Sequence, residues 1–121
     1  PEGPTHTDTP TGLCDPRELE FILINLVGNA IAAMSNSPVR NLQVTWRTAD
    51  GMLLIDVTDT GRGIREEDWN RVLDSRYSTK ATGGEGLPNS RKYLRKYGGN
   101  LTIVRSAPSK GSTFRVALPE N

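Results

Sequence analysis

The chain has 121 residues, which suits a single domain, and its 35% hydrophobic content is enough for one core. Its formal net charge of +1 gives no strong attraction to polyanions, so we expect no nucleic-acid partner. The single cysteine, Cys14, excludes an internal disulfide bond, and no apolar run approaches the ~20 residues that span a bilayer.

Residues 1–13 are rich in proline and glycine and show no periodicity, so we interpret them as a linker or leading segment with room for one short edge strand. The domain itself is expected at 14–121. Because the chain begins at Pro1 rather than Met, we expect a fragment or a processed product. No signal peptide is visible, and a reducing, cytoplasmic setting is the expectation.

Asp15 and Pro16 predict the start of a helix that runs to about Met34, because Asp is a good N-cap and Pro is favoured at the first helical position. The apolar positions follow the helical i, i+3/i+4 pattern: Leu19, Ile22, Leu23, Leu26, Val27, Ala30, Ile31 and Met34. Asn25 and Asn29 lie one turn apart at the edge of this stripe. Their amides could hold a cation through carbonyl oxygens, or simply bond to neighbouring backbone.

Alternating apolar residues at Leu42, Val44 and Trp46 predict a half-buried strand, and Asp50-Gly51 is typical of a hairpin turn. The next strand covers residues 52–59, so the two should pair antiparallel.

The second strand ends in Asp59-Thr60-Gly61-Arg62-Gly63-Ile64. Leu53, Ile55 and Val57 share one face of this strand with Asp59, which directs a carboxylate toward the core. Such a group needs a hydrogen-bond donor. The hexapeptide therefore fits either a small-molecule site or a tight turn in which the acid caps the following residues.

Residues 65–73 suggest a short helix, and a long polar stretch follows over 74–88. Long loops in compact domains are usually functional lids or disordered, and this one carries Lys80, Gly83, Gly84 and Gly86, which suit phosphate oxygens. A helix is predicted from about Pro88 to Tyr97, followed by strands at 101–105 and 114–118. The order of elements predicts an antiparallel sheet covered on one face by helices.

Four motifs occur together along the chain: Asn25-x-x-x-Asn29; Asp59-x-Gly61-x-Gly63; Tyr77-Ser78-Thr79-Lys80 with Gly84-x-Gly86-Leu87; and Gly111-Ser112-x-Phe114. In this combination the chain resembles the ATP-binding domain of the GHKL superfamily (gyrase, Hsp90, histidine kinase, MutL) over residues 13–119. The closest branch is that of the bacterial sensor histidine kinases. The fold that this implies is α+β: a two-layer α/β sandwich with a mostly antiparallel, mixed sheet of about five strands and about three helices on one face.

The resemblance also implies roles for individual residues. Asn29 matches the asparagine that holds Mg²⁺, Asn25 matches a polar position that assists catalysis, and Asp59 matches the aspartate that accepts the adenine amino group. The residues implied to contact ATP are Asn29, Asp59, Gly61, Gly63, Ile64, Thr79, Lys80, Gly84, Gly86, Leu87 and Ser112.

The implied activity is transfer of the γ-phosphoryl group of Mg-ATP to a histidine on a separate dimerisation domain of the same protein, which then supplies a response regulator. His6, in the polar leading segment, lacks the surroundings of such an acceptor. The isolated domain should then be monomeric and unable to phosphorylate itself, and its parent a homodimer. An inner-membrane anchor in the parent stays open.

The chain departs from the family pattern at Ala32, where Lys, Glu or Asp is common, and at Leu73, Ser75, Arg76 and Glu85 in the lid. Two alternatives therefore stay open: a degenerate module that senses nucleotide or docks a partner, and a serine kinase of the anti-sigma-factor type.

Overall fold

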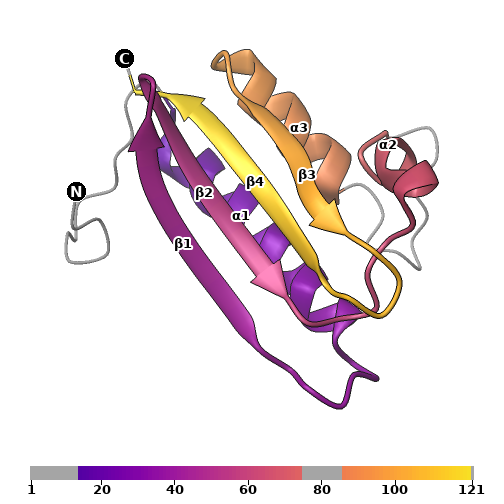
Figure 1. Ribbon diagram of the computed structural model, residues 1–121. Coiled ribbons are helices and arrows are strands. Elements are labelled where there is room, and N and C mark those ends of the chain that lie inside the picture. Colours follow the sequence, from indigo (N-terminus) through magenta and orange to yellow (C-terminus); the bar gives the residue numbers. More distant parts are fainter. Residues whose placement is uncertain (1–13, 75–85, 121) are drawn as a thin grey trace.

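The computed structural model describes residues 14–74 and 86–120. Its elements in chain order are α1 (Pro16–Ala33), β1 (Leu42–Ala49), β2 (Met52–Asp59), a 3-10 turn (Glu66–Asp68), α2 (Trp69–Val72), α3 (Gly86–Lys96), β3 (Asn100–Ser106) and β4 (Ser112–Pro119). Figure 1 shows the strands lying side by side in one sheet, with the helices packed outside it. The linker or edge strand that was expected in residues 1–13 lies outside the described residues.

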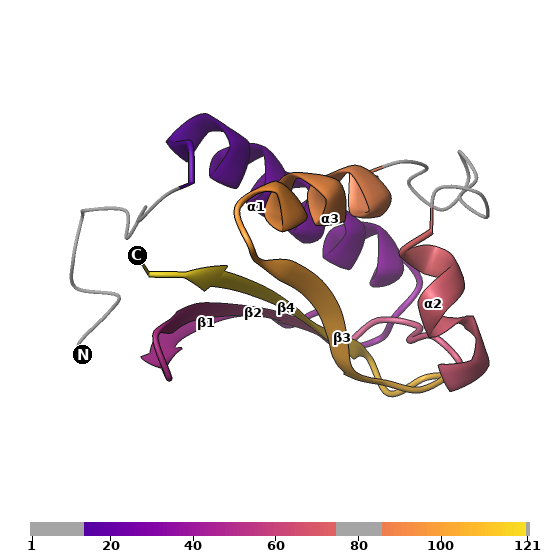
Figure 2. The ribbon, with the colours of Figure 1, turned by 90° about the horizontal axis from the view of Figure 1, so that it is seen from above.

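The strands form one antiparallel sheet in the order β1-β2-β4-β3. Helices α1 and α3 lie on the same face of this sheet, with α2 beyond one end (Figure 2). The two-layer α+β prediction is thus confirmed. The described part of the chain has four strands rather than about five, and no parallel pair. The reason is that β1–β2 and β3–β4 are hairpins, and the only candidate for a fifth strand was the leading segment.

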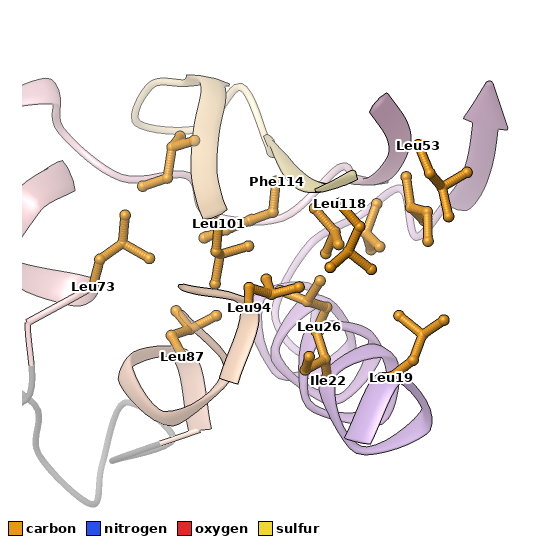
Figure 3. Packing of buried hydrophobic residues seen from close by; sticks show 14 of the residues in the cluster. Leu19, Ile22, Leu26, Leu53, Leu73, Leu87, Leu94, Leu101, Phe114 and Leu118 are labelled. Carbon is orange, nitrogen blue, oxygen red and sulfur yellow. The ribbon is translucent and has the colours of Figure 1, made fainter. Parts of the chain in front are cut away.

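The core lies between the sheet and the two long helices. The register pairs Leu53 with Leu118 and Val57 with Phe114, so these side chains share the face that the helices cover. From the helix layer, Ile22 of α1 and Leu94 of α3 are both 0% exposed. Figure 3 shows them meeting the sheet residues. This confirms the predicted inward face of β2.

Helix α1 begins as its sequence predicts. The Asp15 carboxylate accepts a hydrogen bond from the Arg17 amide at 2.9 Å, and Pro16 occupies the first turn. Helix α3, however, begins at Gly86, two residues before the predicted start at Pro88. The first turn of a helix tolerates proline because its N–H groups have no intrahelical acceptor, so Pro88 did not mark the boundary.

Strand β1 was predicted to be half-buried, and this was wrong for most of its length. Leu42 is 40% and Val44 is 48% exposed, although both point to the helix side of the sheet. The reason is that α1 packs over β2 rather than over this edge strand. Among the helices in the described part of the chain, none has the length and apolar composition needed to span a membrane.

Candidate functional site

The candidate site is built around Asp59, the last residue of β2. Its side chain is only 4% exposed and points to the core side, as the strand alternation predicted. One carboxylate oxygen accepts the Gly61 amide at 2.8 Å. Burial raises the pKa of Asp59 above 3.8, and the Gly61 and Ser112 amides and Arg62 partly offset this. Since a carboxylate has about four acceptor positions, two backbone donors leave room for another.

The turn after Asp59 is pressed between two other segments. A Cβ on Gly61 would lie 2.5 Å from the Ala33 carbonyl oxygen at the end of α1. Gly63 has a φ of +73°, and a Cβ there would lie 1.8 Å from the Ala107 carbonyl oxygen. Both glycines are therefore required by packing. This is a reason separate from the purine contact that the resemblance implies.

Hydrogen bonds fasten the same turn to its neighbours. The Arg62 amide donates to the Ala33 carbonyl (3.0 Å), and the Ser109 amide donates to the Arg62 carbonyl (2.7 Å). The Ile64 amide donates to the Ser106 hydroxyl at 2.7 Å. The end of α1, the β3–β4 turn and the Asp59 turn therefore form one connected unit (Figure 1).

Ser112 lies directly across the sheet from Asp59 in the β2–β4 register and is 5% exposed. Its hydroxyl is 2.6 Å from the Ser106 hydroxyl. The structure thus places Ser112, one of the residues that the resemblance implies contact ATP, beside Asp59. Ser106 was not predicted as part of this unit. The signal was its position at the end of β3, where a hairpin pairs it with Ser112.

Asn25 and Asn29 are half-buried on α1. The Asn25 side-chain amide donates a hydrogen bond to the Phe21 carbonyl at 2.9 Å. This is the bond to neighbouring backbone that was one of the two alternatives for this side chain. Its oxygen faces the start of α3, because a Cβ on Gly86 would lie 2.8 Å from Asn25 Oδ1. The two helices therefore approach closely where Asn25 meets Gly86.

Some of the other residues predicted to contact ATP are described by the structure, and some are not. Thr79, Lys80 and Gly84 lie outside the described residues. Leu87 is 8% exposed and belongs to the hydrophobic core. Ile64 is half-buried, packs against the core, and its carbonyl accepts the Trp69 indole N–H at 3.1 Å.

Residues 14–74 and 86–120 contain no group of three or more His, Cys, Asp or Glu side chains that could hold a metal ion by themselves. An amide oxygen such as that of Asn29 is a hard oxygen donor of the kind Mg²⁺ accepts. The donor set therefore fits a magnesium ion that arrives with phosphate oxygens.

Comparison with known proteins gives a consistent family. The family model described as "Histidine kinase-, DNA gyrase B-, and HSP90-like ATPase" matches residues 14–121. Sensor protein FixL of Bradyrhizobium diazoefficiens is 38% identical over 109 residues, which cover 88% of this chain and 21% of that protein. Sensor histidine kinase ZraS of Escherichia coli is 35% identical over 119 residues, covering 97% of this chain and 25% of ZraS.

Solved structures agree with the sequence relatives. The nucleotide-free catalytic domain of histidine kinase ThkA has a TM-score of 0.76 and 26% identity, over 88% of this chain and 69% of that chain. Full-length ShkA in complex with AMPPNP shares the fold at a TM-score of 0.73 and 23% identity, over 84% of this chain and 21% of that one. The chain spans only about a quarter or less of the two curated relatives described above.

Proposed function

This chain belongs to the histidine kinase-, DNA gyrase B- and HSP90-like ATPase family, and we propose that it binds Mg-ATP at the Asp59 turn and donates the γ-phosphoryl group to a histidine of another domain. Its sequence relatives are sensor kinases, and it is the ATP-binding catalytic domain of that class. The transfer itself, its acceptor and its partners are proposals.

The buried carboxylate of Asp59 is the observation that carries the proposal. Burial raises the pKa of Asp59 and so makes ionisation of this side chain less favourable, and two backbone donors only partly compensate. The exocyclic amine of adenine is a neutral donor that would supply a further hydrogen bond at this position. Asp59 would then recognise adenine, and Gly61, Gly63, Ile64 and Ser112 would border the ring.

Phosphate and metal contacts are assigned to residues farther along the site. Asn29 would hold Mg²⁺, which neutralises charge on the phosphates when bound, and Asn25 would assist the transfer. Thr79, Lys80 and Gly84 are proposed to contact phosphate oxygens through backbone amides and the lysine cation. Gly86 and Leu87 would fix the end of this segment, and Gly86 allows α3 to approach Asn25.

The proposed reaction breaks the bond between the γ-phosphorus and the bridging oxygen and forms a phosphorus–nitrogen bond to an imidazole. ADP is the leaving group. The acceptor histidine would belong to a helical dimerisation domain of the parent protein. A response regulator would then receive the phosphoryl group, and the parent would act as a homodimer while residues 14–121 alone stay monomeric.

Titration calorimetry with Mg-ATP tests the adenine site. Asp59→Asn should weaken binding by about tenfold or more, because a hydrogen bond to a charged group is worth roughly 1.5–3 kcal/mol. Asp50→Asn is the matched control. Asp50 lies in the β1–β2 turn with a φ of +54°, which Asn also tolerates. Equal affinities of the unsubstituted chain and a folded Asp59→Asn variant would refute the adenine assignment.

A second measurement addresses the acceptor. The domain is mixed with the helical domain of its parent and labelled Mg-ATP. Acid-labile phosphate on that domain supports the histidine kinase. Nucleotide binding without transfer favours the degenerate module that Ala32 motivates, and acid-stable phosphoserine favours the serine kinase.

A further inference from the structure

The hydroxyl of Thr60, the residue after Asp59, bonds to the connection between α1 and β1. It donates to the Val39 carbonyl at 2.7 Å and accepts the Asn41 amide at 3.0 Å. A threonine hydroxyl has one hydrogen, which goes to this carbonyl rather than to the Met34 sulfur, because sulfur is a weak acceptor and lies 3.5 Å away. Both hydrogen bonds to the connection can therefore exist at the same time.

These bonds lie where the pairing of β1 with β2 ends. Asp59 pairs with Leu42 at the end of that ladder. Thr60 follows Asp59, and its side chain bonds to backbone groups at positions 39 and 41, which precede Leu42. A side chain thus continues the attachment to this side of the sheet beyond the last pair of backbone residues.

The carboxylate of Asp59 is oriented from the same short stretch. It accepts the Gly61 amide at 2.8 Å, and the Gly61 carbonyl accepts the Gly111 amide at 3.1 Å on the β4 side. Thr60 lies between Asp59 and Gly61, so its hydroxyl holds on the β1 side a segment that Gly111 holds on the β4 side. A shift of Thr60 would move both the Asp59 backbone and the amide that orients its carboxylate.

The proposed function needs the Asp59 carboxylate at one place, because a hydrogen bond weakens steeply when its angle departs from linearity. Resting on that proposed function, we propose that Thr60 is a positioning residue for adenine recognition. Its hydroxyl holds the end of β2 against the α1–β1 connection, and so keeps the Asp59 carboxylate directed at the exocyclic amine. Thr60 acts through Asp59 rather than by contacting the nucleotide.

The neighbour on the other side of Asp59 supplies a matched control. Thr58 Oγ1 lies 3.0 Å from Thr113 Oγ1, which makes a hydrogen bond between β2 and β4. Thr58 and Asp59 are consecutive residues of a strand, so Thr58 points to the opposite face of the sheet. Thr58→Val therefore removes a threonine hydroxyl bond next to Asp59 that does not involve the α1–β1 connection.

The test compares the affinity for Mg-ATP with that for the magnesium complex of purine riboside triphosphate, in which hydrogen replaces the exocyclic amine. The unsubstituted chain should prefer ATP about tenfold, since the amine bonds to a charged group. Thr60→Val keeps the shape of the side chain without its hydroxyl, and should lower this preference roughly fivefold, the effect of one ordinary hydrogen bond. Thr60→Ser restores the hydroxyl and should restore most of the preference, and Thr58→Val should retain it.

Thr60→Val should fold, because Val39 and Asn41 are exposed and water can replace the hydroxyl at their backbone groups. Thr60→Ala takes its place if it does not. An unchanged ratio of the two affinities in the folded variant, or an equal fall in Thr60→Ser or Thr58→Val, would overturn the positioning role while the proposed function stands. An unsubstituted chain that binds the two nucleotides equally, or binds neither, would instead refute the proposed adenine site, and this inference with it.

Discussion

At the scale of single residues, the Asp59 turn depends on Gly63 for both conformation and space. Its φ is +73°, and a Cβ would lie 1.8 Å from a backbone oxygen that cannot move away as a side chain could. We expect Gly63→Ala to destabilise the domain by more than the ~1–2 kcal/mol of a left-handed conformation alone. Urea unfolding followed by circular dichroism measures the effect.

Gly51 supplies the control for that substitution. It has a nearly equal φ of +75°, but no heavy atom within 4 Å of the position of a Cβ. Gly51→Ala should therefore show only the conformational part, about 1–2 kcal/mol. Equal losses in the two variants would mean that the turn can shift away from Ala107.

Ser90 of α3 is the one buried side chain in the described part of the chain whose polar atom has no hydrogen-bond partner. It is 0% exposed. Ser90→Ala should raise the free energy of unfolding by about 1 kcal/mol, because it removes an unsatisfied hydroxyl and improves helix propensity. Thermal unfolding should show a higher Tm.

Ser112→Ala should act in the opposite direction, although Ser112 is also buried, because its hydroxyl pairs with that of Ser106. A Ser90→Ala variant that is less stable than the unsubstituted chain would show that the Ser90 hydroxyl is bonded in solution.

At the scale of elements, α1 protects β2 but not β1. Val44 and Val57 are cross-strand partners on the same face, yet Val57 is 1% exposed and Val44 is 48% exposed. Val57→Ala should cost about 2–3 kcal/mol, because it removes buried apolar surface and leaves a cavity. Val44→Ala should cost under about 1 kcal/mol in the same urea titration.

Both substitutions lose the same side-chain atoms and similar strand propensity, so the difference between them reports the cover above each strand. Similar losses at the two positions would mean that another segment covers Val44 in solution.

Helix α1 and strand β2 could be predicted from the sequence because their signals are local: a cap, a helical stripe and an alternating strand. The exposure of β1 could not, since alternation identifies an inward face without saying whether a helix lies over it. The start of α3 was missed for a related reason. Proline within a first turn looks the same in sequence as proline at a boundary.

The candidate site also contains residues that local motifs predict and one residue that they do not. Asp59 and its glycines form one continuous motif, and Ser112 carries a short motif of its own. Ser106 was not predicted, because its role depends on the register between β3 and β4 and on the Ile64 amide, which is 42 residues away in sequence. The β3–β4 hairpin makes the pairing of Ser106 with Ser112 a local signal, but no local pattern in the sequence indicates the contact with the Ile64 amide.

At the scale of the whole molecule, the two long helices are joined at the end opposite the candidate site. The Glu18 carboxylate accepts hydrogen bonds from Lys96 Nζ (2.8 Å) and from the Tyr97 hydroxyl. Glu18 lies in the first turn of α1, whereas the Asp59 turn contacts Ala33 at its other end, about 22 Å away at 1.5 Å per residue. This contact should therefore support the fold without shaping the nucleotide site.

The pH dependence of stability in a Glu18→Gln variant tests whether this contact supports the fold alone. The hydrogen bonds from Lys96 and then Tyr97 lower the pKa of Glu18 below 4.5. A lowered carboxyl pKa gives stability that is present above 4.5 and is lost as the pH falls through the folded-state value. Unfolding titrations should thus find Glu18→Gln less stable than the unsubstituted chain at pH 7, with the difference shrinking below pH 4.5.

The contribution of Glu18 should also fall at alkaline pH, because Glu18 raises the pKa values of Lys96 and Tyr97 above 10.5 and 10.0, and their protons are needed for the contact. Glu20→Gln, which changes an exposed neighbour on α1, is the matched control. ATP affinity should be the same in both variants. A Glu18→Gln variant with unchanged stability at pH 7, or with altered ATP affinity, would contradict a purely structural link between the helices.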